Sequence, residues 1–133
     1  MDINEIEKII RNRLEDNGFI KYNHINLIEV KENYAKMEVE LTSESLNPNG
    51  TAHGGLIFGL ADSAMGTAAS TNGRNVCTIN SQIDYLKSGK GNKLVAEAEE
   101  LKVGRTTAVY RCNIKDENNT LIATCTGTYF FLD

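Results

Sequence analysis

The pattern of apolar and polar positions begins with a helical period. After Asp2, apolar residues recur every three to four positions, at Ile3, Ile6, Ile10 and Leu14. Asp2 and Glu5 have the spacing of a capping box. Gly18 is a residue type common just after a helix end. We therefore predict an amphipathic helix over residues 3–17 that lies on the surface of the domain.

From residue 24 the period changes to two, which is typical of half-buried strands. Asn47 to Gly50 form a predicted loop that holds the only proline of the chain. A turn at Asn72-Gly73 separates a central helix from the later strands. The predicted strands cover residues 24–30, 34–41, 76–86, 93–103, 105–115 and 120–132.

Residues 54–70 form the predicted central helix, which has two distinct faces at 100° per residue. The bulky face carries Leu56, Ile57, Leu60, Ala61, Ala64, Met65 and Ala68. The other face carries Gly55, Gly59, Asp62 and Gly66. Asp62 is the only carboxylate between Thr51 and Gly73, and an acid in so apolar a segment is costly to bury without a reason.

The order of elements predicts an α+β domain spanning residues 1–133, in which an antiparallel sheet of five to six strands curls around one helix. One helix cannot cover such a sheet on both faces. An open edge or outer face remains, which favours a homo-oligomer.

Composition argues against several classes of function. The net charge of −4 disfavours a nucleic-acid partner, because phosphate binding needs a basic face. Two histidines and three scattered cysteines form no metal-ligand pattern, and nucleotide-binding glycine motifs are absent. We expect no metal and no cofactor.

The segment 52–69 is too short and too polar to span a membrane. The odd cysteine count and a start without signal-peptide character predict a reducing cytoplasm.

Two parts of the central helix carry candidate chemistry. The backbone N–H groups of Gly54 and Gly55 at its start favour negative charge, including a carbonyl oxyanion. Asp62 is a candidate general base or nucleophile. Gly54 and Asp62 lie about 12 Å apart along one helix, too far to act on one carbonyl. If both are catalytic, they come from two copies of the helix.

Simpler readings of these residues remain open. The glycine stripe is also explained by close helix packing. His53 is more often a structural hydrogen-bonding residue than a base, and it can orient the loop by bonding a backbone carbonyl. A Cys77–His53 nucleophile has no local support.

The loop and helix together resemble a known family. Asn47-Pro48-x-Gly50-x-x-His53-Gly54-Gly55, then Phe58 and Leu60-Ala61-Asp62, is similar to the signature of hotdog-fold acyl-CoA thioesterases. The match is to the phenylacetic-acid-degradation branch of the 4-hydroxybenzoyl-CoA thioesterase superfamily. The resemblance extends over roughly residues 20–133, through Thr78–Leu86, Val103–Thr106 and Leu121–Phe130.

The resemblance implies a hydrolase that cleaves acyl-CoA thioesters, here with a medium-chain or aromatic acyl group. Asp62 would be the nucleophile or general base, and the Gly54 N–H would polarise the thioester carbonyl. Asn47 and His53 would shape the site, the former by positioning water, and Thr78 would help to hold that water. The implied assembly is a homodimer, often paired into a homotetramer, that places Asp62 and Thr78 opposite the loop of the partner. The residues assigned to substrate binding are Gly55, Phe58, Ser81, Lys87, Lys90 and Arg105.

The chain departs from the family pattern at Ser88, where a proline commonly ends the strand, so the path of the CoA arm is expected to differ. Lys87, Lys90 and Arg105 are candidates for the CoA phosphates, although exposed lysines at strand ends are usually only solvated. The N-terminal helix is a candidate cap for the acyl pocket. One alternative is a non-catalytic acyl-CoA-binding or sensing domain, which has no need of Asp62. Another is a hydratase or dehydratase, which would pair its histidine and acid differently.

Overall fold

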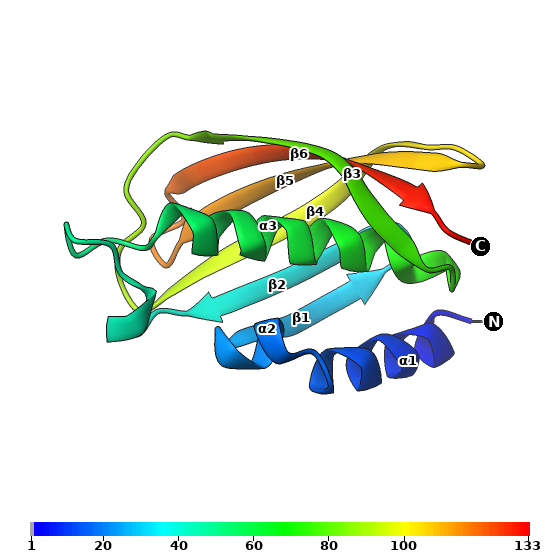
Figure 1. Ribbon diagram of the computed structural model, residues 1–133, viewed down its shortest axis with the longest axis horizontal. Coiled ribbons are helices and arrows are strands. Elements are labelled where there is room, and N and C mark those ends of the chain that lie inside the picture. The colour runs from blue at the N-terminus through cyan, green and yellow to red at the C-terminus, as the bar shows by residue number, and fades with distance from the viewer. Residues whose placement is uncertain (1) are drawn as a thin grey trace.

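The computed structural model of the protein describes residues 2–133 (Figure 1). Within these residues the chain forms three α-helices, two short 3-10 helices and six strands. The helices are α1 (Ile3–Glu15), α2 (Gly18–Tyr22), η1 (Ser43–Ser45), α3 (Gly54–Ala69) and η2 (Ser70–Asn72). The strands are β1 (Ile25–Lys31), β2 (Tyr34–Glu40), β3 (Val76–Tyr85), β4 (Lys93–Val103), β5 (Thr107–Asp116) and β6 (Leu121–Phe131).

All six strands belong to one antiparallel sheet with the order β1-β2-β4-β5-β6-β3. β3 does not pair with β2 or β4, its neighbours in sequence, because the chain passes through α3 between β2 and β3 and returns to the far edge of the sheet. β1 and β3 are therefore the two edge strands. The predicted sheet of five to six strands is confirmed.

The sheet curls around α3, which lies along its concave face (Figure 1) and contacts all six strands. The apolar face of α3 is buried as predicted, including Leu60, Ala61, Ala64 and Met65. It packs against alternating inward residues of the strands, such as Met37, Ala96, Tyr110, Ile114 and Ile122. A six-stranded sheet can bury one helix in this way because every strand contributes one apolar face.

The N-terminal prediction is correct in type but wrong in length. Asp2 caps α1 by accepting a hydrogen bond from the Glu5 N–H (2.9 Å), and the helix ends at Glu15 rather than at residue 17. Gly18 is not the residue after its end. Instead Asn17 accepts from the Ile20 N–H (3.2 Å) and starts the separate helix α2. One turn of helix is too short to show a period in the sequence.

Three strand starts also differ from prediction, that of β6 by one residue and those of β1 and β5 for local backbone reasons. His24 has a φ of 57° and lies before β1, which begins at Ile25. The Gly104 N–H donates to the Thr107 carbonyl (2.8 Å), and this tight turn delays β5 to Thr107. The other predicted strand ends agree with the structure to within two residues.

Candidate active site

The polar face of α3 is partly covered by α2. A Cβ atom on Gly59 would lie 2.7 Å from the Phe19 ring, so only glycine permits this approach without a shift. Gly55, Asp62 and Gly66 share this face and remain exposed or half-buried. The close-packing reading is therefore correct at Gly59, whereas Asp62 needs another explanation.

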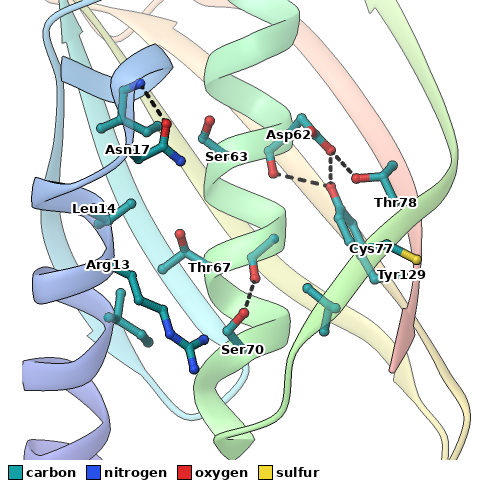
Figure 2. A pocket seen from close by; sticks show the side chains of 14 residues that line it. Arg13, Leu14, Asn17, Asp62, Ser63, Thr67, Ser70, Cys77, Thr78 and Tyr129 are labelled. Carbon is teal, nitrogen blue, oxygen red and sulfur yellow. Dashed lines mark hydrogen bonds between the residues drawn. The ribbon is translucent and has the colours of Figure 1, made fainter. Parts of the chain in front are cut away.

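Asp62 is held by two hydroxyl groups from strands β3 and β6 (Figure 2). Thr78 Oγ1 donates to Asp62 Oδ1 over 2.8 Å, and the Tyr129 hydroxyl donates to the same oxygen over 2.7 Å. Asp62 Oδ2 has no hydrogen-bond partner among residues 2–133. We call Asp62, Thr78 and Tyr129 the acid half-site. It leaves one carboxylate oxygen fixed in direction and available for chemistry.

Tyr129 is the member of the acid half-site that the sequence analysis missed. It is 1% exposed, and its ring packs edge-to-face on Tyr110 at a centroid distance of 6.1 Å. Burial and the adjacent Asp62 carboxylate raise the pKa of Tyr129 well above its usual range, so the hydroxyl stays a donor. A tyrosine on an inward strand face needs a hydrogen-bond partner, and that requirement was the available signal.

A second arrangement lies at the start of α3. His53 caps the helix, with Nδ1 accepting from the Gly55 N–H over 2.8 Å. The His53 carbonyl accepts from the next two N–H groups, those of Leu56 and Ile57. The N–H of Gly54 is left without a partner among residues 2–133. His53 therefore orients the helix start by accepting from a backbone N–H, not by donating to a carbonyl as expected.

Tyr85, at the end of β3, covers this helix start. Its hydroxyl donates to the Gly54 carbonyl over 2.7 Å, and a Cβ on Gly54 would lie 3.3 Å from that hydroxyl. We call His53, Gly54 and Tyr85 the amide half-site. Because His53 accepts from the Gly55 N–H, the Gly54 N–H is the backbone donor that remains free for a carbonyl oxygen at this helix start, as far as residues 2–133 show.

Asn47 shapes the loop that leads to the amide half-site. Its Oδ1 accepts from the N–H groups of Asn49 (2.9 Å) and Thr51 (3.2 Å), and its Nδ2 donates to Thr51 Oγ1 (2.9 Å). Both lone pairs of the side-chain oxygen are thus used inside the loop, and one N–H of the amide remains for a ligand.

The two half-sites of one chain open into different cavities. Asp62, Thr78 and Tyr129 line a cavity of about 250 Å³. Gly54 and Tyr85 line another of about 500 Å³, and no residue lines both. The separation agrees with the distance of about 12 Å along α3. Within one chain the two arrangements therefore stay apart.

The remaining predicted substrate-binding residues are scattered. Phe58 is half-buried and packs on the core. Ser81 Oγ lies 3.4 Å from Cys125 Sγ, on the inward side of β3. Lys87 borders the cavity of the amide half-site. Lys90 is exposed and lines neither of the two cavities.

Arg105 lies far from Lys87 in the same chain. The Lys87 N–H donates to the Ile122 carbonyl at the start of β6, whereas the carbonyl of Thr106 accepts from Phe131 at its end. A strand of this length spans roughly 30 Å. Arg105 is thus at the end of the sheet near the acid half-site, and Lys87 is at the end near the amide half-site.

No group of three or more His, Cys, Asp or Glu side chains in residues 2–133 is arranged to hold a metal ion. Over the same residues, no helix has the length and apolar character needed to cross a membrane.

Comparison with known proteins identifies the family. The sequence profile described as the thioesterase superfamily matches residues 49–123, more than half of the chain. The chain belongs to the thioesterase superfamily. This places it among hydrolases that act on thioester bonds.

Individual thioesterase relatives cover most of the chain. A protein of Archaeoglobus fulgidus named putative esterase is 42% identical over 105 residues, covering 78% of this chain and 68% of the relative. Acyl-coenzyme A thioesterase PaaI of Escherichia coli is 30% identical over 114 residues, covering 85% of this chain and 81% of the relative.

Solved structures agree on the fold of this thioesterase. The E. coli PaaI structure, a protein of the phenylacetic acid degradation operon, superposes with a TM-score of 0.94 and covers 98% of this chain and 96% of that one, at 25% identity. A Streptococcus mutans protein solved with bound acetyl CoA has a TM-score of 0.77 and 31% identity. The match covers 80% of this chain and 87% of that one. The expected hotdog fold and the PaaI-like branch are confirmed.

Proposed function

We propose that this thioesterase hydrolyses an acyl-CoA to the free acid and CoA, in a site built from the acid half-site of one protomer and the amide half-site of its partner. One observation carries the proposal. A free carboxylate oxygen on Asp62 and a free N–H on Gly54 occur on the same helix but open into separate cavities.

The substrate class is supported by the relatives. The E. coli relative is named an acyl-CoA thioesterase, and the S. mutans neighbour holds acetyl CoA. The cavity of about 250 Å³ beside Asp62 exceeds the roughly 150 Å³ of a cavity that accepts benzene. It therefore suits a medium-chain or aromatic acyl group.

The chemistry follows from the two half-sites. The thioester carbonyl oxygen accepts a hydrogen bond from the Gly54 N–H at the positive end of α3, which stabilises the oxyanion. Asp62 Oδ2 takes a proton from water as the water oxygen bonds the carbonyl carbon. The C–S bond then breaks, and the proton passes to the CoA thiolate. Direct attack by Oδ2 would form a mixed anhydride that water opens, and both routes need the same oxygen.

The open edge of β3 supports the dimer. β3 pairs with β6 on one side only, carries no proline or lysine, and exposes Ile79 by 57%. Such an edge is a template for pairing with a second copy. Pairing would bring Asp62 of one protomer toward Gly54 of its partner, and Arg105 toward the partner's Lys87 end. We extend the proposal to dimers that pair into a homotetramer.

The remaining roles follow from the contacts. Thr78 keeps Asp62 Oδ1 in place beside the water, His53 holds the helix start, and the free amide N–H of Asn47 faces the substrate. Catalysis by these groups needs no cofactor. The three free cysteines support a reducing cytoplasm as the site of action.

Replacement of Asp62 tests the chemistry. Asp62→Asn keeps the shape and lets Thr78 and Tyr129 still donate to Oδ1, but it removes the base. We expect thiol release from acyl-CoA to fall by about 10²–10⁴-fold, with an unchanged circular dichroism spectrum. Turnover at the wild-type rate would refute the assignment. A wild-type protein that binds acyl-CoA without thiol release would instead be a binding domain.

Subunit mixing tests the shared site. Gly54→Pro removes the free N–H at the first helical position, where proline is tolerated, and the extended His53 (ψ 134°) suits a following proline. Gly54→Ala adds a Cβ but keeps the N–H, and is the matched control. Mixing inactive Asp62→Asn and Gly54→Pro protomers should restore about one quarter of wild-type activity, because half of the dimers carry one intact site of two. No recovery after denaturation and joint refolding would place both groups in one chain.

A further inference from the structure

The cavity beside Asp62 lies between α1, α3 and the start of β3 (Figure 2). If the proposed function holds, the acyl group enters this cavity, because its thioester carbonyl must lie at Asp62. Part of the wall is apolar, as an acyl chain requires. The apolar lining residues are Ile10, Leu14, Ile20 and Val76.

The lining of the cavity also contains charged and polar residues. Asp62 is the one carboxylate and Arg13 the one cation among the lining residues. Thr67 and Ser70 line the part of α3 that lies beyond Asp62 toward its C-terminal end. A pocket for a plain alkyl chain needs no cation, so Arg13 points to a charged group on the ligand.

Arg13 has no carboxylate within ion-pair distance in residues 2–133, whereas Arg11 on the same helix pairs with Glu7 over 2.9 Å. Figure 2 shows the Arg13 side chain extending from α1 toward the turn of α3 that carries Ser70. A cation in the last turn of α1 also suits the helix dipole. Arg13 is exposed, so water solvates its guanidinium in the free protein, and a ligand carboxylate would not have to displace a protein partner.

The end of α3 does not exclude an anion from this place. The Gly66 carbonyl accepts from Ser70 Oγ (2.8 Å), and the Ala68 carbonyl accepts from Thr71 Oγ1 (2.8 Å). These hydroxyl donors reduce the negative potential of the helix end. A guanidinium binds a carboxylate through two parallel charge-assisted hydrogen bonds, which outweighs the remaining dipole.

The length of the ligand follows from the helix. Asp62 and Ser70 are separated by a rise of about 12 Å, and an extended chain advances about 1.2 Å per bond. Both residues line the cavity, and the hydrogen bonds from the ligand to the two side chains take up part of this distance. An acyl chain of about six to eight carbons fits the remaining space.

We propose that this cavity selects acyl groups that end in a carboxylate, so that the substrate is the CoA monothioester of a linear dicarboxylic acid and Arg13 binds the distal carboxylate. Asp62 at the other end repels that carboxylate and fixes the direction of the chain. This inference rests on the proposed acyl-CoA hydrolysis and adds the acyl class to it.

Two substrates of equal chain length test the inference by thiol release. Suberoyl-CoA ends in a carboxylate, and octanoyl-CoA ends in a methyl group. We expect wild-type protein to favour suberoyl-CoA. Arg13→Met should lower kcat/KM for suberoyl-CoA about tenfold, mainly through KM, because Arg13 is exposed and the pair is partly screened. It should leave octanoyl-CoA unchanged. Lys8→Met, which removes an exposed cation outside this cavity on the same helix, is the matched control.

Equal use of the two substrates by wild-type protein, or an equal effect of Arg13→Met on both, would overturn the inference while leaving thioester hydrolysis intact. If wild-type protein hydrolyses neither substrate, the proposed function is refuted instead. A binding measurement then tests the inference by itself. By calorimetry, Asp62→Asn protein should bind suberoyl-CoA more tightly than octanoyl-CoA, and adding Arg13→Met should abolish the difference. Equal affinities would overturn the inference.

Discussion

The hydroxyl of Tyr129 offers a sharp test of how the acid half-site works. Tyr129→Phe removes one oxygen and keeps the ring, which fills the same volume against Tyr110 and beside Gly66. The lost contacts are the bond to Asp62 Oδ1 (2.7 Å) and a longer one to the Asp62 carbonyl (3.3 Å). The fold should therefore survive while the carboxylate loses one of two anchors.

The magnitude follows from burial. A hydrogen bond to a charged group contributes about 1.5–3 kcal/mol. Water cannot easily replace the Tyr129 hydroxyl, which is buried. If this energy orients Asp62 in the transition state, kcat falls about 10- to 100-fold, at about 1.4 kcal/mol per factor of ten. Thr78 is exposed, so water can take the place of its hydroxyl, and Thr78→Val should cost less than about fivefold.

The assay is free-thiol release from acyl-CoA, with thermal unfolding as the control for folding. The double variant should lose more than the product of the single losses, because both hydroxyls donate to one oxygen. Wild-type kcat in Tyr129→Phe, at unchanged stability, would show that this bond is structural and that Asp62 needs no anchor from β6.

Three further predictions concern packing and titration. Gly59→Ala should stabilise the protein by about 1 kcal/mol in a Phe19→Ala background and by clearly less in wild-type protein, since the added Cβ would meet the Phe19 ring; equal effects in chemical denaturation would contradict the contact. Cys112 and Cys125 should react with a thiol reagent only after unfolding, because burial raises the pKa of both thiols; rapid labelling of either would argue against it. Burial raises the pKa of Tyr110 to about 12. The contribution of its neutral hydroxyl to the free energy of unfolding is therefore complete below about pH 10 and declines from there toward pH 12. In denaturation curves, Tyr110→Phe protein should lose less stability at alkaline pH than wild-type protein.

The missed parts of the site share one physical cause. A period of two shows which residues of a strand face inward, but not which residue of another strand lies opposite. The register of β3 and β6 places Thr78 opposite Tyr129, and only this pairing brings both hydroxyls to Asp62. Tyr85 reaches Gly54 across 31 positions of sequence in the same way. Such contacts are set by tertiary structure.

A second kind of difference came from short polar side chains that bond the nearby backbone. Gly18 suggested a helix end, yet the Asn17 side chain accepts from the Ile20 N–H and starts a new helix. The Asn47 oxygen likewise accepts from two N–H groups of its own loop, which leaves its amide N–H for the predicted role in the site. The sequence pattern does not show which polar side chains make such local bonds.

The sequence by itself determined the two faces of α3, the isolated acid Asp62 and the distance that separates it from Gly54, because helix geometry depends only on residue spacing. It also determined that one helix leaves a sheet of this size incompletely covered. The tertiary structure decided which donors hold Asp62, which N–H of α3 stays free, and that Arg13 borders the same cavity as the acid. These depend on strand register and on how separate elements pack, and no local pattern encodes either of them.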